Sequence, residues 1–175
     1  MPISTITGNS FGTAQTPSVN GIQFPAAQVA STDANTLDDY EEGTFTPTLG
    51  GSGSDPTGVS SSGVVGTYTK IGNVVNFALS FTFTTYTGVS GSLTIRGLPF
   101  TISGGHQYCG LATDNYFGWN SGYTALSCYM VANGTSLVPV AIINGTGNTG
   151  ISLTTYNPSN SNSKTLYIYG SYKAA

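Results

Sequence analysis

The sequence predicts an all-β fold: an antiparallel β-sandwich, jelly-roll-like in form, with an extended N-terminal arm. Glycine is frequent, at 24 of 175 residues, and aromatic residues make up 11% of the chain, whereas charged residues make up only 6%. This composition is typical of strands joined by many turns, and Ala, Glu, Lys and Leu are too sparse for a helical protein. The length suits one domain with an appendage, and it is sufficient to bury a core.

The clearest strand covers residues 74–84, where large apolar side chains alternate with small or polar ones. Alternation with a period of two places the large side chains on one face of a strand. We therefore expect four of them in the core: Phe77, Leu79, Phe81 and Phe83. The preceding Gly72-Asn73 dipeptide predicts a two-residue hairpin turn, so residues 64–70 are expected to form the partner strand.

About nine strands are expected, with a spacing that favours two antiparallel sheets around one core. A first strand over residues 44–49 precedes a glycine- and serine-rich loop over residues 50–58. Asn133-Gly134 and Asn144-Gly145 predict turns between later strands. These later strands cover residues 93–98, 108–113, 123–131, 137–143, 151–156 and 164–172.

The arm covers residues 1–34 and the β-sandwich domain covers residues 35–175. Because the arm has no sustained apolar period, it cannot bury enough area alone to offset an ordering entropy of about 1–2 kcal/mol per residue. Its apolar residues indicate instead that a partner or sister chains order it, and the alternative is a disordered tail. Ile22 and Phe24 are therefore candidate subunit or attachment contacts.

An acidic segment joins the arm to the domain. Five of the seven acidic residues lie within ten positions, at residues 33, 38, 39, 41 and 42. Carboxylates this close repel one another. We expect the segment to face water or to meet cationic or hydrogen-bond donor groups, for example from a neighbouring copy. Further candidate subunit or attachment contacts are therefore Asp38, Asp39, Tyr40, Glu41 and Glu42.

Three segments carry a family resemblance. They read Asn-Thr-Leu-Asp-Asp-Tyr-Glu-Glu-Gly-Thr-Phe-Thr-Pro at residues 35–47, Gly-Thr-Tyr-Thr-Lys-Ile-Gly-Asn-Val-Val at residues 66–75, and Gly-Leu-Pro-Phe at residues 97–100. Together they resemble the tail-fibre or receptor-binding domains of tailed bacteriophages. The resemblance implies a virion structural protein, a homotrimeric short tail fibre that recognises a glycan or protein on the host surface. It also implies attachment of the arm to other tail or baseplate proteins, and synthesis in the bacterial cytoplasm before assembly into the virion tail.

Two other functions are considered. A capsid-decoration or head-fibre protein would use the same domain, and the short arm keeps this alternative open. A polysaccharide-cleaving tail enzyme would need two carboxyl groups about 5–9 Å apart across a sugar. The acidic segment offers carboxyl groups, but a short extended stretch would not shape a substrate cleft, so we predict that the protein is not an enzyme.

No catalytic residue, metal site or cofactor is predicted. The single histidine, His106, lies three residues from Cys109, and an odd separation on a strand points two side chains to opposite faces. One histidine and two cysteines are too few for a four-ligand zinc site. We expect Cys109 and Cys128 to be reduced, buried thiols.

Nucleic acid and membranes are not expected as partners. The net charge is -3, and the four cations are scattered along the chain, which gives no electrostatic footprint for nucleic acid or anionic lipid. The sequence contains no run of about 18 apolar residues, so membrane insertion is not predicted. The first residues also lack the basic and apolar regions of a signal peptide.

Residues 114–123 form a glycine-flanked loop that combines aromatic side chains with amides and one acid. Aromatic faces can cover the apolar C–H groups of a sugar, while Asn and Asp bind its hydroxyls. The alternative is that Phe117 and Trp119 plug one end of the sandwich. The candidate receptor-binding residues are Asp114, Asn115, Tyr116, Phe117, Trp119 and Tyr123.

Overall fold

A computed structural model describes residues 17–18, 21–22, 27, 31–33, 37, 39–88, 90–104, 111–115, 123–143, 147–150 and 164–175. Of residues 17–18, 21–22, 111–115, 123–126, 141–143, 147–150 and 164, only the backbone is described. The described residues contain strands and no helix, and hence no helix long and apolar enough to cross a membrane. The strands are β1 (Pro17–Ser18), β2 (Gly21–Ile22), β3 (Tyr40–Phe45), β4 (Thr48–Gly51), β5 (Thr57–Ile71), β6 (Val74–Thr87), β7 (Leu93–Arg96), β8 (Leu111–Asn115), β9 (Tyr123–Met130), β10 (Ser136–Ile143), β11 (Gly147–Gly150) and β12 (Lys164–Lys173).

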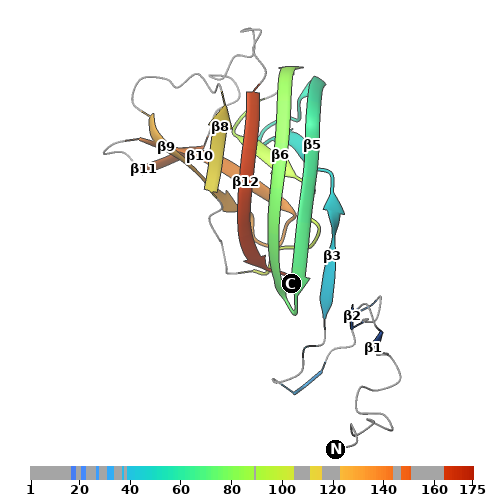
Figure 1. Ribbon diagram of the computed structural model, residues 1–175. Helices are drawn as coiled ribbons and strands as arrows, with labels where there is room; N and C mark the ends of the chain where they lie inside the picture. Colours follow the sequence, from blue (N-terminus) through green and yellow to red (C-terminus); the bar gives the residue numbers. More distant parts are fainter. Residues whose placement is uncertain are drawn as a thin grey trace, which may run out of the picture.

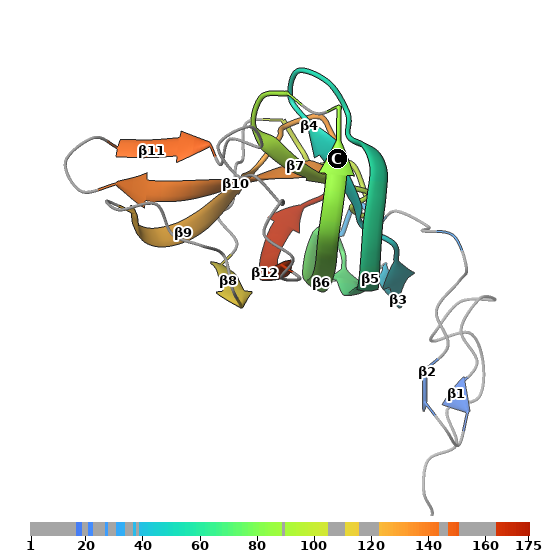
Figure 2. The same ribbon diagram turned by 90° about the horizontal axis from the view of Figure 1, so that it is seen from above.

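The strands form two five-stranded sheets and one two-stranded pair. The first sheet has the order β3-β5-β6-β12-β8 (Figure 1). The second has the order β11-β10-β7-β4, with β9 also paired to β10, and Figure 2 shows it as a separate layer from the first. All the strand pairs are antiparallel. The predicted all-β, antiparallel fold is confirmed, whereas its jelly-roll-like sandwich form stays a prediction.

The core draws side chains from both sheets. The alternation predicted for residues 77–83 is confirmed, because Phe77, Leu79, Phe81 and Phe83 are 5%, 5%, 2% and 0% exposed. On the first sheet they are joined by residues of β12, including Leu166 and Ile168. The second sheet contributes Leu93, Ile95, Cys128, Met130 and Leu137 to the same cluster.

The β5–β6 hairpin confirms the predicted turn but is longer than predicted. Ile71 pairs with Val74, and Gly72 has a φ of 57°, a conformation that glycine adopts without steric cost. The strand predicted over residues 64–70 begins earlier, at Thr57. The pairing of its first part with β6 shifts register three times, and Gly58 and Gly63 there have positive φ.

The first predicted strand, residues 44–49, is wrong as a single strand. β3 ends at Phe45 in the first sheet, and β4 begins at Thr48 in the second. The buried Pro47, which has no N–H to donate to a ladder, lies between them where the chain changes sheets. The predicted loop over residues 50–58 is also too long, because β4 continues to Gly51 and β5 begins at Thr57.

The later strands agree in part. β9, β10 and β12 lie within one residue of their predicted ends, whereas β7 ends two residues earlier than predicted. β8 continues to Asn115, two residues beyond its predicted end, and residues 108–110 at its predicted start lie outside the described residues. β11 was not predicted. The Asn133-Gly134 turn is confirmed, with Asn133 at a φ of 59°. The predictions over residues 144–145 and 151–156 lie outside the described residues.

Candidate functional site: a motif cluster and an open sheet face

The three segments that carry the family resemblance meet on the inner face of the first sheet. β3 pairs with β5 from Tyr40 opposite Ile71 to Phe45 opposite Gly66, which joins the first two segments in register. The third segment contributes Phe100, whose ring packs edge-on against Tyr68 at a centroid distance of 5.4 Å. We call the five residues that meet here the motif cluster: Asp39, Glu41, Tyr68, Lys70 and Phe100.

Asp39 and Lys70 form an ion pair within the motif cluster. The two side chains are only 10% and 9% exposed, and Lys70 Nζ lies 5.3 Å from the centroid of the Phe100 ring. The backbone carbonyl of Asp39 also accepts a hydrogen bond of 2.9 Å from Gly72 N–H. Asp39 therefore meets a cation of its own chain, while its role as a subunit or attachment contact stays a prediction.

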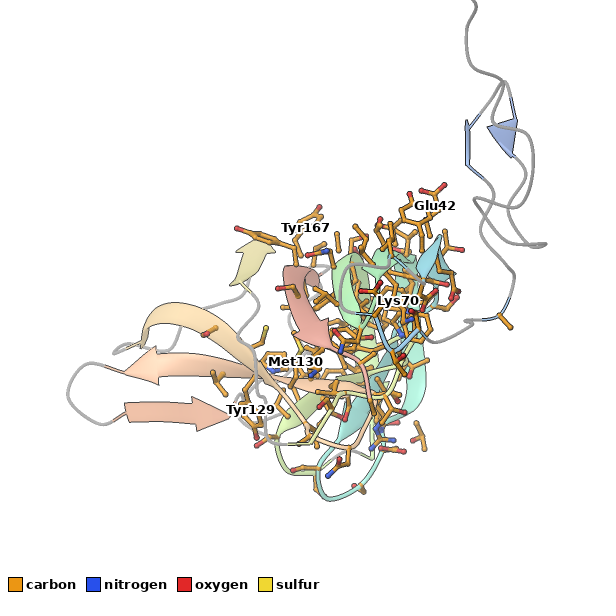
Figure 3. The ribbon with its side chains drawn as sticks, turned by 90° about the horizontal axis from the view of Figure 1, so that it is seen from below. Glu42, Lys70, Tyr129, Met130 and Tyr167 are labelled. Atoms are coloured by element: carbon orange, nitrogen blue, oxygen red, sulfur yellow. The ribbon has the colours of Figure 1, made fainter. Side chains whose placement is uncertain are left out.

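The acidic segment divides between two faces, as the alternation along a strand requires. Glu41 lies on the same face as Asp39 but is solvent-exposed, and it accepts a hydrogen bond from the hydroxyl of Tyr68. That contact, together with burial, raises the pKa of Tyr68 to about 12. Glu42 and Tyr40 point outward, and Tyr40 donates a hydrogen bond of 3.0 Å to Glu42 Oε2. In Figure 3, Glu42 and Lys70 lie on opposite sides of the sheet. Asp38 lies outside the described residues.

Two glycines of the motif segments make room for aromatic rings. A Cβ on Gly66 would lie 2.5 Å from the Phe45 ring, and one on Gly43 would lie 2.9 Å from the Tyr68 hydroxyl oxygen. Real Cβ atoms do not approach other atoms so closely, so each ring covers the glycine opposite it on the neighbouring strand. The glycines and aromatics of these segments thus act as cross-strand pairs.

The C-terminal strand holds Phe100 in place. The buried Tyr172 donates its hydroxyl to the Phe100 carbonyl at 3.1 Å and accepts from the Phe100 N–H at 3.2 Å. Burial raises the pKa of Tyr172 to about 12. The motif cluster therefore contacts both the β5–β6 hairpin and the last strand, β12. These contacts indicate that the cluster has a structural role in the domain.

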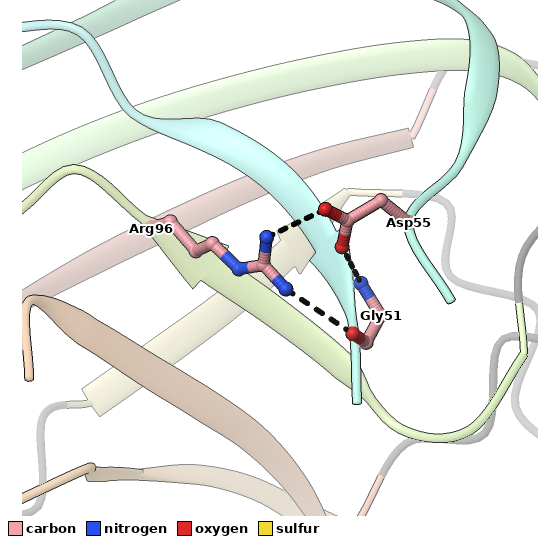
Figure 4. Close-up of polar contacts among 3 residues, drawn as sticks. All are labelled: Gly51, Asp55 and Arg96. Carbon is pink, nitrogen blue, oxygen red and sulfur yellow. Dashed lines mark hydrogen bonds and ion pairs between the residues drawn. The ribbon is translucent and has the colours of Figure 1, made fainter. Parts of the chain in front are cut away.

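A second ion pair lies at the surface of the second sheet (Figure 4). Arg96 Nη1 contacts Asp55 Oδ2 at 2.7 Å, and Arg96 Nη2 donates to the Gly51 carbonyl at 3.2 Å. Gly51 N–H donates to Asp55 Oδ1 at 3.3 Å. The hydrogen bond from Arg96, more than that from Gly51, lowers the pKa of Asp55. The Arg96 and Asp55 side chains are 43% and 58% exposed, so the pair closes a surface loop rather than forming a buried site.

The outer face of the first sheet is open and carries apolar and aromatic side chains in the described part of the chain. We call it the open sheet face. Among the described side chains on it, only Glu42 and Lys173 are charged, and the others between them are mostly Thr and Ser. Tyr167 projects from this face in Figure 3. The large apolar residues on it are 38–52% exposed: Tyr40, Val65, Ile71, Val74, Tyr167 and Tyr169.

The loop predicted over residues 114–123, which we call the recognition loop, begins only after β8, which ends at Asn115 beside the tyrosines of this face. β8 pairs with β12, with Asn115 opposite Thr165, Asp114 opposite Leu166 and Thr113 opposite Tyr167. At the other end of the loop, Tyr123 begins β9 in the second sheet. Tyr116, Phe117 and Trp119 lie outside the described residues, so the choice between recognition and packing stays open. Of the predicted arm contacts, Ile22 ends β2 opposite Pro17, and Phe24 is outside the described residues.

Sequence reasoning missed Tyr167 and Tyr169. The signal was present, because the two tyrosines alternate with the buried Leu166 and Ile168 along one strand. A strand with apolar side chains on both faces has one face that needs either a second layer or a binding partner.

The described residues contain no group of three or more His, Cys, Asp or Glu that could hold a metal ion. Cys128 is buried, as predicted, while His106 and Cys109 lie outside the described residues.

Comparison of the chain with protein-family models, curated proteins and solved structures finds no match.

Proposed function

We propose that this chain is a structural protein of a tailed-bacteriophage particle, a short tail fibre whose domain binds the host surface. The observation that carries the proposal is the convergence of the three motif segments. Residues 39–41, 68–70 and 100 are far apart in the sequence, yet they meet in one cluster. A resemblance whose separate parts fit together in space supports a shared fold better than one motif alone. The proposed form of that fold is the jelly-roll-like sandwich.

The open sheet face is the part of the described surface that best suits recognition. Tyrosine offers a large amphipathic surface at a low cost in side-chain entropy, and hydroxyl groups can exchange hydrogen bonds with a sugar. With few charges, the face suits a neutral glycan better than an anionic polymer. The recognition loop begins at the same edge of the sheet, beside Tyr167. The loop and the open sheet face together form the proposed receptor-binding surface.

The location of the protein in the particle tests this proposal. A gold-labelled antibody against the domain, applied to intact phage and viewed by electron microscopy, should mark the tail. Labelling of the head would support the capsid-decoration alternative, and the absence of label from purified, antibody-accessible particles would contradict a structural role.

Tyr167→Ala and Tyr169→Ala should each weaken binding of the purified protein to host cells by about 1 kcal/mol or more, as expected for exposed aromatic contacts. The melting temperature should change little, because both side chains are about half exposed. Tyr129→Ala is a matched control, since Tyr129 is 38% exposed but lies on the second sheet. Equal loss of binding in all three variants would contradict a role specific to the open sheet face.

Trp119→Ala and Tyr123→Ala separate the two interpretations of the recognition loop. If the loop binds the host, each change should weaken adsorption by more than about 1 kcal/mol and leave the melting temperature unchanged. If Trp119 plugs the domain, the change should lower the melting temperature by several degrees, as expected for about 3–5 kcal/mol of lost packing. Adsorption measured beside a thermal melt decides between these outcomes, and unaltered adsorption with a folded protein would exclude the loop.

A trimer is expected in solution, with the arm contributing to assembly or attachment. Light scattering at micromolar concentration should give three times the chain mass. A single chain mass would contradict the trimer.

A further inference from the structure

Lys70 and Asp39 place an amine and a carboxyl group in contact inside the domain. Their side chains are about 10% exposed, in contrast to the Arg96–Asp55 pair, which is about half exposed. The Phe100 ring lies over the amine, and Tyr68 packs against that ring. Removing two charges from water is costly unless their interactions replace the lost hydration. Conversion of the pair to a neutral amide would remove that cost.

A third group completes the arrangement. Glu41 lies directly opposite Lys70 in the β3–β5 register, and cross-strand partners have Cβ atoms about 4.5–5.5 Å apart. Asp39 precedes Glu41 by two residues and shares its face of the strand. The hydroxyl of Tyr68 donates a hydrogen bond to Glu41 and so holds the carboxylate on this side of the sheet. The inner face thus brings together an amine, a carboxyl group to be attacked and a second carboxylate that can accept a proton.

We propose that Lys70 and Asp39 form an intramolecular isopeptide bond, with Glu41 as the proton acceptor. Transfer of a proton from the Lys70 ammonium to the Asp39 carboxylate gives an amine and a carboxylic acid. The Nζ lone pair attacks Cγ of Asp39, and Glu41 accepts a proton from Nζ. As the Cγ–OH bond breaks, Glu41 returns that proton to the departing hydroxyl group. The products are one amide and one water molecule, and the reaction needs no oxidant, reductant or cofactor.

The bond would lie where the N-terminal segment joins the domain. β3 is an edge strand that pairs only with β5 among the described strands, so its hydrogen bonds to β5 carry any pull on the N-terminal segment. An amide between residues 39 and 70 would fasten the start of β3 to β5 covalently. This mechanical role rests on the proposed function, because a tail fibre is pulled during adsorption. The bond itself does not depend on that function, and a mass measurement tests it separately.

The intact mass of the purified full-length chain gives the first test. The wild-type protein should be lighter than its sequence mass by one water, whereas Lys70→Arg and Asp39→Ala should each have their full sequence masses. The wild-type measurement does not depend on whether a variant folds. A folded wild-type protein at its full sequence mass would overturn the proposal.

A tryptic digest locates the bond. Trypsin cleaves after lysine and arginine, and the first two such residues of the chain are Lys70 and Arg96. Because an amide-linked Lys70 is no longer a substrate, the linked chain should yield residues 1–96 as one peptide lighter by a water. Release of residues 1–70 and 71–96 as separate peptides of full mass, or a loss of water mapped elsewhere, would contradict the assignment.

Two further variants test the roles of Glu41 and of burial. Glu41→Gln keeps an oxygen that can accept the Tyr68 hydrogen bond but removes the proton acceptor, so the chain should fold and stay unlinked. Complete linkage in that variant would overturn the role of Glu41. Arg96→Lys places an amine beside Asp55 at the exposed pair, and no second water should be lost there. Linkage at that solvent-exposed pair would contradict the requirement that the amine and the attacked carboxyl group be buried.

Discussion

Replacing Phe81 by alanine should destabilise the domain by about 3–5 kcal/mol, the usual cost of removing a buried aromatic side chain. Phe81 is 2% exposed in the middle of β6, and its ring centroid lies 6.0 Å from that of Phe83. Because small domains are typically stable by only about 5–15 kcal/mol, the loss should lower the urea midpoint strongly or prevent folding. Urea denaturation followed by tyrosine and tryptophan fluorescence measures it.

The neighbouring Thr82→Ala is the matched control for Phe81→Ala. Thr82 points away from the core and exchanges a hydrogen bond of 2.9 Å with the hydroxyl of Thr165. Loss of that bond should cost only about 0.5–1.5 kcal/mol. If both substitutions lowered stability equally, the assignment of inner and outer faces along β6 would be wrong.

Asp39→Ala should have the second large effect, because it removes the carboxyl partner of the enclosed Lys70. Deleting one member of a buried pair typically costs about 3–5 kcal/mol, since the remaining charge stays without compensation. Lys70 would then lie beneath Phe100 without its carboxylate. The free energy of unfolding in urea should fall by this amount if the partners form an ion pair, and by more if an amide also restricts the unfolded chain.

Asp55→Ala provides the comparison for Asp39→Ala. Its pair with Arg96 is exposed, and exposed pairs contribute only about 0–1 kcal/mol. An Asp39→Ala protein no less stable than Asp55→Ala would show that the motif cluster does not hold the domain together.

The first sheet was predictable from sequence where local rules act alone. The alternation from Phe77 to Phe83 predicted the buried face because strand side chains alternate, and Gly72 predicted the hairpin because its positive φ suits the turn. The change of sheet at Pro47 was not predictable, because proline removes a ladder donor but does not specify which sheet the residues after it join. β3 and β4 are distinct strands because they pair with different partners, β3 with β5 in the first sheet and β4 with β7 in the second.

The motif cluster was visible in the sequence as parts but not as a unit. The crowding of acids predicted that the segment would face water or meet cationic or hydrogen-bond donor groups, and Lys70 was one of four cations in the sequence. The choice of Lys70 depends on the β3–β5 register, which places Glu41 opposite it and Asp39 beside it. Register over such a separation results from the packing of the whole sheet. The open sheet face becomes visible only when both faces of β12 are compared, because Tyr167 and Tyr169 alternate with the buried Leu166 and Ile168.

Competition for adsorption tests the proposed recognition of the host surface by this chain most directly. Cells of the bacterium that the phage infects would be incubated with the purified protein, and the rate of phage adsorption would then be measured. The wild-type protein and Tyr129→Ala should slow adsorption in proportion to their concentration, whereas a protein carrying both Tyr167→Ala and Tyr169→Ala should not. Adsorption at an undiminished rate in the presence of saturating, folded wild-type protein would contradict recognition of the host surface by this domain.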